Sequence, residues 1–273
     1  MASDEKEWYP YTRYFEAMTW YDKNPFSGEL DERAYLLGLR AGDLYVRKHG
    51  RSVKITVSTT HPAMIEPMQE VFGKYARVVL TPKFIRKWKQ LKWEVYSLLH
   101  PSFEFFLTKT IGTNESFLSF FAGFFDAEGS ISIRRQSRST TTRIVMEGSS
   151  NDLGLLTFFD DQLRKLGYNP CFPSKLAHMV GDVVGYGPYT QNFWRLYVNR
   201  TKEAVKLLSS LPIKHREKML KRELAIQYHS KPWKDVSLRV RALRQRIREE
   251  VRMCVKEAKR TYLTRHKITQ IPK

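Results

Sequence analysis

The residues of this chain whose types and spacing indicate chemistry are two acids at the end of an apolar stretch. Asp126 and Glu128 follow residues 120–125, which are aromatic or small. Apolar side chains on every side of a helix predict that the helix is buried. A carboxylate at the end of a buried helix is costly unless it binds a metal ion or a proton. Glu128 is therefore a candidate metal ligand, and the alternative is a core helix that ends in an acidic turn.

The same pattern occurs a second time, earlier in the chain. Residues 36–44 are again mainly apolar and carry an acid, Asp43, near their end. Asp43 and Glu128 are 85 positions apart, and each is followed by a short run typical of a β-strand. A repeat of this length indicates two related halves that meet across a pseudo-two-fold axis.

Small residues four positions apart precede each acid. They are Gly38 and Gly42 in the first copy, and Gly123 and Ala127 in the second. Residues at this spacing share one face of a helix, and small side chains let two backbones approach closely. The spacing therefore predicts that the two helices pack against each other and bring their acids together.

The elements that must position these helices follow the same order in both halves. Apolar and polar residues alternate in Val53–Ser58 and again in residues 91–97, as expected for strands with one buried face. The order predicts an α+β fold of two αββαββα halves with antiparallel sheets. In the second half we expect strands near 129–136, 142–148, 170–176 and 193–199, and helices over 151–166, 202–209, 212–228 and 234–265.

This order divides the chain into five predicted segments. They are an aromatic N-terminal arm (1–30), a first half (31–108), a linker (109–114), a second half (115–230) and a basic helical extension (231–273).

The charge of the chain favours a polyanionic partner. The net charge is +19, and residues 231–273 alone contain 14 Lys and Arg against 4 Asp and Glu. Counterion release makes nucleic acid the favoured partner of so basic a protein, ahead of a membrane surface. No apolar run is long enough for a membrane span, and no secretory signal is expected. The two cysteines, Cys171 and Cys254, lack metal-ligand spacing and fit a reducing compartment.

Residues 121–129, Phe-Ala-Gly-Phe-Phe-Asp-Ala-Glu-Gly, resemble the signature of the LAGLIDADG homing endonucleases. Residues 36–44 look like the first copy in single-chain, two-motif members, and the resemblance extends over about 31–228. The first copy departs from the family pattern. Ala41 stands in place of the first acid, Arg40 in place of an apolar residue and Leu44 in place of the final glycine. The acid that binds metal in this family is the second one, so Asp43 is retained.

The resemblance implies a fold in which the motif helices cross at the pseudo-dyad and two sheets form a saddle over DNA. It implies a monomeric, intron-encoded, site-specific endonuclease that hydrolyses phosphodiester bonds of double-stranded DNA. Asp43 and Glu128 are the implied catalytic metal ligands, with the backbone carbonyls of Gly42 and Ala127 as additional ligands. The implied cofactor is Mg²⁺ or Mn²⁺, with Ca²⁺ as a non-cleaving substitute. Lys214 best matches the lysine that family members place beside the site.

Sequence recognition is expected from the polar faces of the two sheets, and the difference between the halves implies a long, non-palindromic target. The predicted DNA contacts are Arg47, Lys54, Thr56 and Lys92 in the first half, and Ser132, Arg134, Gln136, Arg143 and Arg195 in the second.

Two other functions use the same scaffold. One is a maturase that binds its host intron RNA, and the other is a DNA-binding regulator that does not cleave. The two retained acids favour an endonuclease over pure RNA binding, and a protein with both endonuclease and maturase functions stays an alternative. We expect the protein in a prokaryotic cytoplasm, at the nucleoid, or in an organelle, and not secreted.

Overall fold

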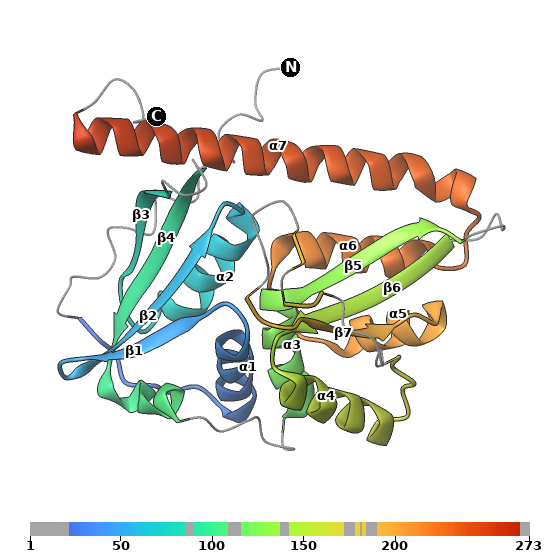
Figure 1. Ribbon diagram of the computed structural model, residues 1–273, viewed down its shortest axis with the longest axis horizontal. Helices are drawn as coiled ribbons and strands as arrows, with labels where there is room; N and C mark the ends of the chain where they lie inside the picture. The colour runs from blue at the N-terminus through green and yellow to red at the C-terminus, as the bar shows by residue number, and fades with distance from the viewer. Residues whose placement is uncertain are drawn as a thin grey trace. The chain divides into compact units, whose positions relative to one another are not determined.

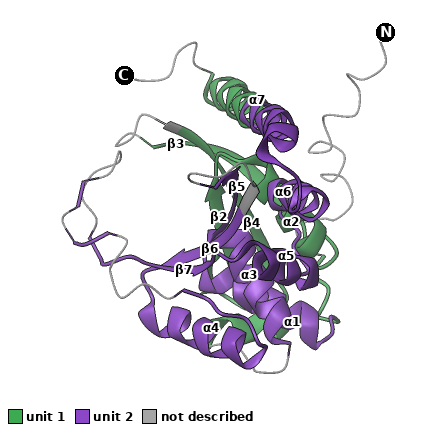
Figure 2. Cartoon of the chain, turned by 90° about the vertical axis from the view of Figure 1, so that its right-hand side faces the viewer, with its two compact units in different colours: residues 1–27, 44–109, 251–273 green, residues 28–43, 110–250 purple. Residues whose placement is uncertain are grey.

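The computed structural model describes residues 22–85, 90–108, 116–136, 142–171, 178–180, 182, 183 and 190–267. Figure 1 labels the helices and strands, and Figure 2 colours the two compact units that the chain forms. The first unit comprises residues 1–27, 44–109 and 251–273, and the second comprises 28–43 and 110–250. Residues 28–43, which carry most of the first motif copy, therefore belong to the same compact unit as the second copy.

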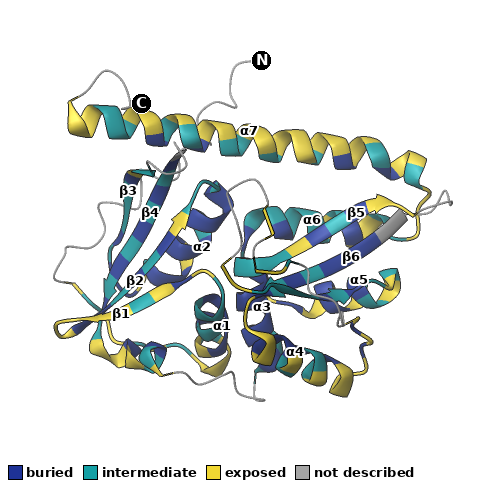
Figure 3. Cartoon of the chain, viewed as in Figure 1, coloured by how far each residue is buried: buried dark blue, intermediate teal, exposed yellow. Residues whose placement is uncertain are grey.

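The first unit contains a four-stranded antiparallel sheet in the order β1-β2-β4-β3. Its strands are β1 (Tyr45–His49), β2 (Ser52–Thr59), β3 (Val78–Ile85) and β4 (Gln90–Leu99). In β2, the buried residues Val53, Ile55 and Val57 alternate with the more accessible Lys54 and Thr56, as the sequence predicted. Figure 3 shows this alternation of buried and accessible positions along the sheet. The sheet therefore has one core face and one polar face.

Helix α2 (Pro62–Phe72) and the 3-10 helix η3 (Pro101–Leu107) complete the core of the first unit. Phe72, Phe103 and Phe106 are fully buried, and Phe103 stacks on Phe106 at 6.0 Å between ring centroids. Phe26 joins this cluster through an edge contact with Phe103 at 5.3 Å. Aromatic burial therefore ties the described end of the N-terminal segment to the first unit.

The second unit contains the two motif helices, α1 (Leu30–Ala41) and α3 (Phe117–Glu128), which pack against each other. Its antiparallel sheet has the order β5-β6-β7. The strands are β5 (Gly129–Arg135), β6 (Thr142–Ser150) and β7 (Trp194–Val198), and the helices that follow are α4 (Leu153–Lys165), α5 (Thr201–Ser210) and α6 (Arg216–Tyr228). Asp152 caps α4 by accepting a hydrogen bond from Leu155 N at 2.9 Å. The predicted α+β class with antiparallel sheets is confirmed.

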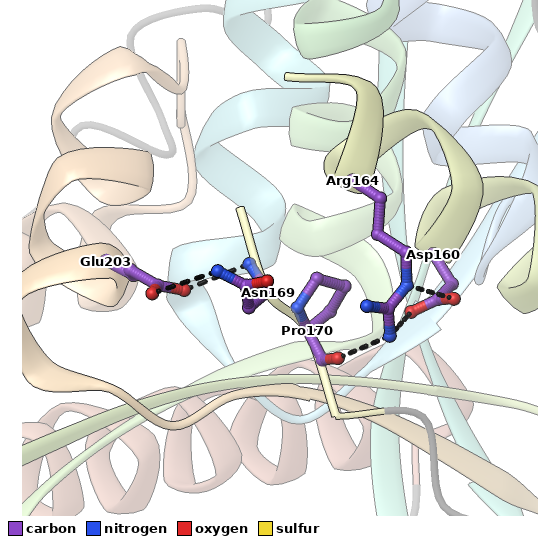
Figure 4. Close-up of polar contacts among 5 residues, drawn as sticks. All are labelled: Asp160, Arg164, Asn169, Pro170 and Glu203. Carbon is purple, nitrogen blue, oxygen red and sulfur yellow. Dashed lines mark hydrogen bonds and ion pairs between the residues drawn. The ribbon is translucent and has the colours of Figure 1, made fainter. Parts of the chain in front are cut away.

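A polar network holds the residues that directly follow α4 (Figure 4). Arg164 donates to Asp160 Oδ2 at 2.9 Å and to the carbonyl of Pro170 at 2.9 Å. The backbone N of Asn169 donates to Glu203 Oε2 on α5 at 3.0 Å. These bonds hold the residues before Cys171, which forms an isolated bridge with Tyr197 of β7. The rest of the strand predicted near 170–176 lies outside the described residues.

Helix α7 (Trp233–His266) confirms the predicted basic helix. Its residues through Glu250 belong to the second unit and the later ones to the first. In the second unit, Arg244 Nη2 donates to Ile133 O at 3.3 Å. In the first unit, Trp93 Nε1 donates to Cys254 O at 3.2 Å. None of the helices in the described ranges is long and apolar enough to cross a membrane.

The two thiols are expected to react at very different rates with a thiol reagent such as Ellman's reagent. Cys171 is exposed, whereas Cys254 is buried, and burial raises the pKa of the Cys254 thiol to about 11. Since the thiolate is the reactive form, one equivalent should react rapidly at pH 8 and the second only on unfolding. Peptide mapping of the labelled site checks this, and rapid labelling of Cys254 in the folded chain would contradict the docking of α7 on Trp93.

The cap position of α1 is Glu29, and Asp31 lies in the first turn, where Ser119 Oγ donates to it at 3.0 Å. The structure corrects one helix start. The helix expected from Pro212 begins at Arg216. The N-terminal arm through Tyr21 and the linker 109–114 lie outside the described residues.

Candidate active site

The motif helices touch through their glycines, as the four-residue spacing predicted. A Cβ atom added to Gly38 would overlap Phe120 O of α3 and lie 2.7 Å from Phe124 N. A Cβ added to Gly123 would overlap Tyr35 O of α1 and lie 2.9 Å from Leu39 N. These partners are backbone atoms, so only glycine permits the two helices to cross at this distance.

The crossing brings the C-terminal ends of the two helices together. A Cβ at Gly42 would overlap the Cβ of Ala127 and lie 3.1 Å from Glu128 Cγ. Asp43 and Glu128 interact both electrostatically and through a hydrogen bond between their carboxyl groups. A hydrogen bond between two carboxyl groups requires a proton on one of them. The structure thus brings together all four residues predicted as metal ligands, and ligation itself stays a prediction.

The electrostatics of Glu128 reflect this arrangement. Burial is the main cause that raises the pKa of Glu128 to about 7, and the neighbouring charge of Asp43 raises it further. Lys218 opposes the shift. Near neutral pH, the ionised form of Glu128 is therefore destabilised by burial and by the charge of Asp43. A cation nearby would stabilise the ionised form.

Asp126, the first acid of the motif, holds the start of α6. Its Oδ2 accepts hydrogen bonds from Lys214 N at 2.6 Å, His215 N at 3.1 Å and Tyr35 Oη at 2.9 Å. Burial raises the pKa of Asp126, whereas Lys218 and these hydrogen bonds lower it. These bonds tie the residues just before α6 to the end of α3, and α6 begins at Arg216.

Lys218 makes the reciprocal contact from α6 to α3. Its Nζ donates to the carbonyls of Phe125 and Asp126, both at 2.6 Å. These carbonyls lie in the last turn of α3, where a cation offsets the helix dipole. Burial lowers the pKa of Lys218 to about 8, opposed by the charges of Asp126, Glu217, Asp43 and Glu128. The two helices therefore hold each other by their ends, and this fixes the backbone that carries Glu128.

The charge of Lys218 acts on Glu128, whereas the family resemblance pointed to Lys214. The Nζ of Lys214 lies 5.8 Å from the centroid of the Tyr35 ring, and its backbone N binds Asp126. The spacing of Lys218 from Ala225 is the sequence signal for its position. Residues seven apart lie on the same face of a helix, and both of these residues are buried along α6. The catalytic role assigned to Lys214 stays untested.

In the first unit, the predicted DNA contacts share the polar face of the sheet. Arg47 of β1 lies opposite Lys54 of β2 in the register. Thr56 lies opposite Tyr96 of β4, whose ring has Lys54 Nζ at 4.5 Å from its centroid. Lys92 lies opposite Lys83. The structure therefore places these four residues on one surface, and their contact with DNA stays a prediction.

In the second unit, Ser132 and Arg134 alternate along β5 with the buried residues Ile131 and Ile133. Gln136 follows the strand and is exposed. The backbone of Arg143 lies opposite Arg134, and its side chain is outside the described part. Arg195 of β7 pairs with Glu147, with Nε at 3.2 Å from Oε1. As in the first unit, DNA contact by these residues stays a prediction.

The donor set at the helix ends fits a divalent cation. The carboxyl groups of Asp43 and Glu128 lie next to each other there, and oxygen donors are what Mg²⁺, Mn²⁺ and Ca²⁺ prefer. Among the described residues there is no group of three or more His, Cys, Asp or Glu that would hold a metal ion alone. Asp43 and Glu128 would therefore hold a cation together with water and oxygens of a bound phosphate, as Mg²⁺ sites commonly do.

Comparison with known proteins gives matches among solved structures. The homing endonuclease I-WcaI bound to its DNA recognition sequence matches with a TM-score of 0.48 at 14% identity, over 70% of this chain and 86% of that one. The chain is similar to homing endonucleases. Mesophilic variants of I-DmoI match with a TM-score of 0.44 at 16% identity, over 67% and 89% of the two chains. The meganuclease I-SmaMI bound to uncleaveable DNA matches with a TM-score of 0.46 at 11% identity, over 79% of this chain and 98% of that one.

The sequence identities of these three matches lie between 11% and 16%. I-DmoI structures in complex with DNA and either Mn or Ca also match. No protein-family model matches the chain, and no curated protein matches it in sequence.

Replacing Tyr35 by Phe is expected to lower the free energy of unfolding by about 1–3 kcal/mol, because Asp126 loses a buried hydrogen bond. Denaturant titration followed by circular dichroism measures the change. Tyr45→Phe is the matched control. Tyr45 is 64% exposed, so its loss of a hydroxyl should change stability by less than about 0.5 kcal/mol. Equal stability of the two variants would show that Asp126 does not depend on Tyr35.

Proposed function

We propose that this protein is a site-specific endonuclease that hydrolyses phosphodiester bonds of double-stranded DNA with a divalent cation. The observation that carries the proposal is the pair Asp43 and Glu128. Two helices that cross at glycine bring these carboxyl groups into hydrogen-bonding contact at their C-terminal ends. Such packing places two mutually repelling acids side by side, an arrangement that suits cation binding.

In the proposed reaction, Asp43 and Glu128 would hold the cation, with the carbonyls of Gly42 and Ala127 as further donors. When bound, the cation would activate a water for in-line attack and would stabilise the leaving 3′-oxygen. Each acid serves mainly one DNA strand. The contacts between Asp126 and α6 hold the site rigid, and Lys218 contributes positive charge beside the acids. Rigid placement of charged groups is a large part of phosphoryl-transfer catalysis.

Recognition of the target is assigned to the polar faces of the two sheets, with α7 as a contact to the phosphate backbone. The net charge of +19 supports binding to a polyanion. Because the two sheets carry different side chains, the target is non-palindromic. Retention of both acids favours cleavage over the function of a DNA-binding regulator.

The experiment is metal-dependent cleavage of a defined DNA. The substrate is a plasmid that carries the sequences flanking the protein's own coding region, joined directly. We expect cleavage at one site with Mg²⁺ or Mn²⁺, and binding without cleavage with Ca²⁺ or EDTA. Specific binding without cleavage under every metal condition would support the regulator instead. Binding to intron RNA that accelerates splicing would add the maturase function.

A further inference from the structure

The polar face of the second sheet carries one acid among side chains that are mostly polar or basic, with Val145 buried among them. The described side chains of this face are Ser130, Ser132, Arg134, Val145, Glu147, Ser149, Arg195 and Tyr197. Glu147 is the single acid among them. A carboxylate on a surface that meets DNA repels phosphates and so lowers non-specific affinity.

Glu147 is held in place by Arg195, its diagonal neighbour across the strands. Arg195 Nε lies 3.2 Å from Glu147 Oε1, and the two side chains are 34% and 27% exposed. The Nη2 atom of Arg195 lies 3.3 Å from His178 Nε2. The guanidinium therefore lies between an acid and an imidazole, at the accessible surface of the sheet.

The first sheet carries a comparable pair on its own polar face. Lys83 Nζ donates to Glu94 Oε2 at 2.7 Å, and the side chains are 59% and 24% exposed. Glu94 alternates on β4 with Lys92 and Tyr96, and it is the single acid on the described part of this face. Each unit thus presents one basic side chain that is paired with one glutamate on the polar face of its sheet.

We propose that each pair, Arg195 with Glu147 and Lys83 with Glu94, reads one G·C base pair in the major groove. The basic side chain donates to O6 and N7 of guanine, and the glutamate accepts from the N4 amino group of cytosine. This inference rests on the proposed function, since it concerns the specificity of the same DNA-binding surface.

The base edge is the feature of DNA that suits these acids. A carboxylate has no donor for a phosphate oxygen, whereas the cytosine amino group is a hydrogen-bond donor. Without DNA, the basic partner keeps each acid neutralised. Because both members of each pair are partly exposed, water can replace their mutual contact at little cost when the base pair arrives.

The test is selection of duplexes from a randomised DNA pool in Ca²⁺, with wild type, Glu147→Gln, Glu94→Gln and Asp160→Asn. Wild type should enrich a target with a fixed G·C pair in each half. Glu147→Gln should lose preference at one of these pairs by about 10-fold or more, because an amide both donates and accepts. Glu94→Gln should lose preference at the other. Both variants should bind random DNA more tightly than wild type.

Asp160→Asn is the matched control, since Asp160 also pairs with an arginine (Figure 4) but lies on helix α4 and not on the sheet. It should retain the wild-type preferences. Thermal denaturation of each variant excludes unfolding as the cause of a lost preference. An enriched target whose base preferences are unchanged in Glu147→Gln and Glu94→Gln would overturn this inference alone. Failure of wild type to enrich any duplex would overturn the proposed function, and the inference with it.

Discussion

Glu128→Gln is expected to reduce DNA cleavage at least about 100-fold while leaving target affinity within a few-fold of wild type. The amide keeps the shape of the side chain but loses the negative charge that would hold a cation, and metal-ion stabilisation of a transition state is worth several kcal/mol. Single-turnover cleavage of the bound target in Mg²⁺ measures the effect, and a gel-shift assay in Ca²⁺ measures binding. Asp43→Asn should have a similar effect on cleavage of the other strand.

The same substitution should make the metal-free protein more stable. The folded-state pKa of Glu128 is about 7, above its ordinary value, so the folded protein binds this proton more tightly than the unfolded chain does. This contribution is fully present below about pH 4.5 and is lost as the pH rises through 7. Glutamine has no such cost, so the stability gained on substitution should grow with pH, to about 2–3 kcal/mol at pH 8.

Denaturant unfolding at pH 5.5 and pH 8 in EDTA checks the sign of this change. Glu104→Gln is the control, because Glu104 is an exposed acid paired with Lys48 in the first unit, and its substitution should affect neither cleavage nor this pH dependence. A Glu128→Gln variant that cleaves at the wild-type rate would rule out the assigned role of Glu128. A variant less stable than wild type at pH 8 would show that Glu128 is charged without cost.

Gly123→Ala is expected to lower the free energy of unfolding by about 3 kcal/mol or more. The added methyl group would overlap Tyr35 O and lie 2.9 Å from Leu39 N, and these backbone atoms cannot rotate away. Overpacking in a core typically costs 1–3 kcal/mol, and a rigid neighbour places this site at the upper end. The loss should outweigh the gain of about 1 kcal/mol that alanine gives in a helix. Urea titration followed by circular dichroism measures the difference.

Gly154→Ala is the matched control for this packing effect. Gly154 lies in α4, and an added Cβ would be 3.4 Å from Asp152 Oδ1, which is an ordinary contact. The control should keep or slightly raise stability. If Gly123→Ala folds with wild-type stability, the helices do not cross through Gly38 and Gly123, and the approach of Asp43 to Glu128 loses its basis.

The sequence alone determined the two motif helices, their small contact faces, the acids at their ends and the order of the strands. These features follow from local rules. Residues four apart share a helical face, and alternating residues share a strand face. A glycine such as Gly38 or Gly123 lets another backbone approach closely, whatever the rest of the fold. For this reason the pairing of Asp43 with Glu128 was predictable before any contact was known.

Only the tertiary structure decided which groups surround the acids. The N–H groups of Lys214 and His215 bind Asp126, 88 and 89 positions away along the chain, and α6 starts after them, at Arg216. Lys218, and not Lys214, places its Nζ atom at the end of α3, because Lys218 lies on the buried side of α6. The register of β6 against β7 likewise set Glu147 beside Arg195. Such contacts join residues far apart in the chain, and local sequence patterns contain no information about which distant group fills a given place.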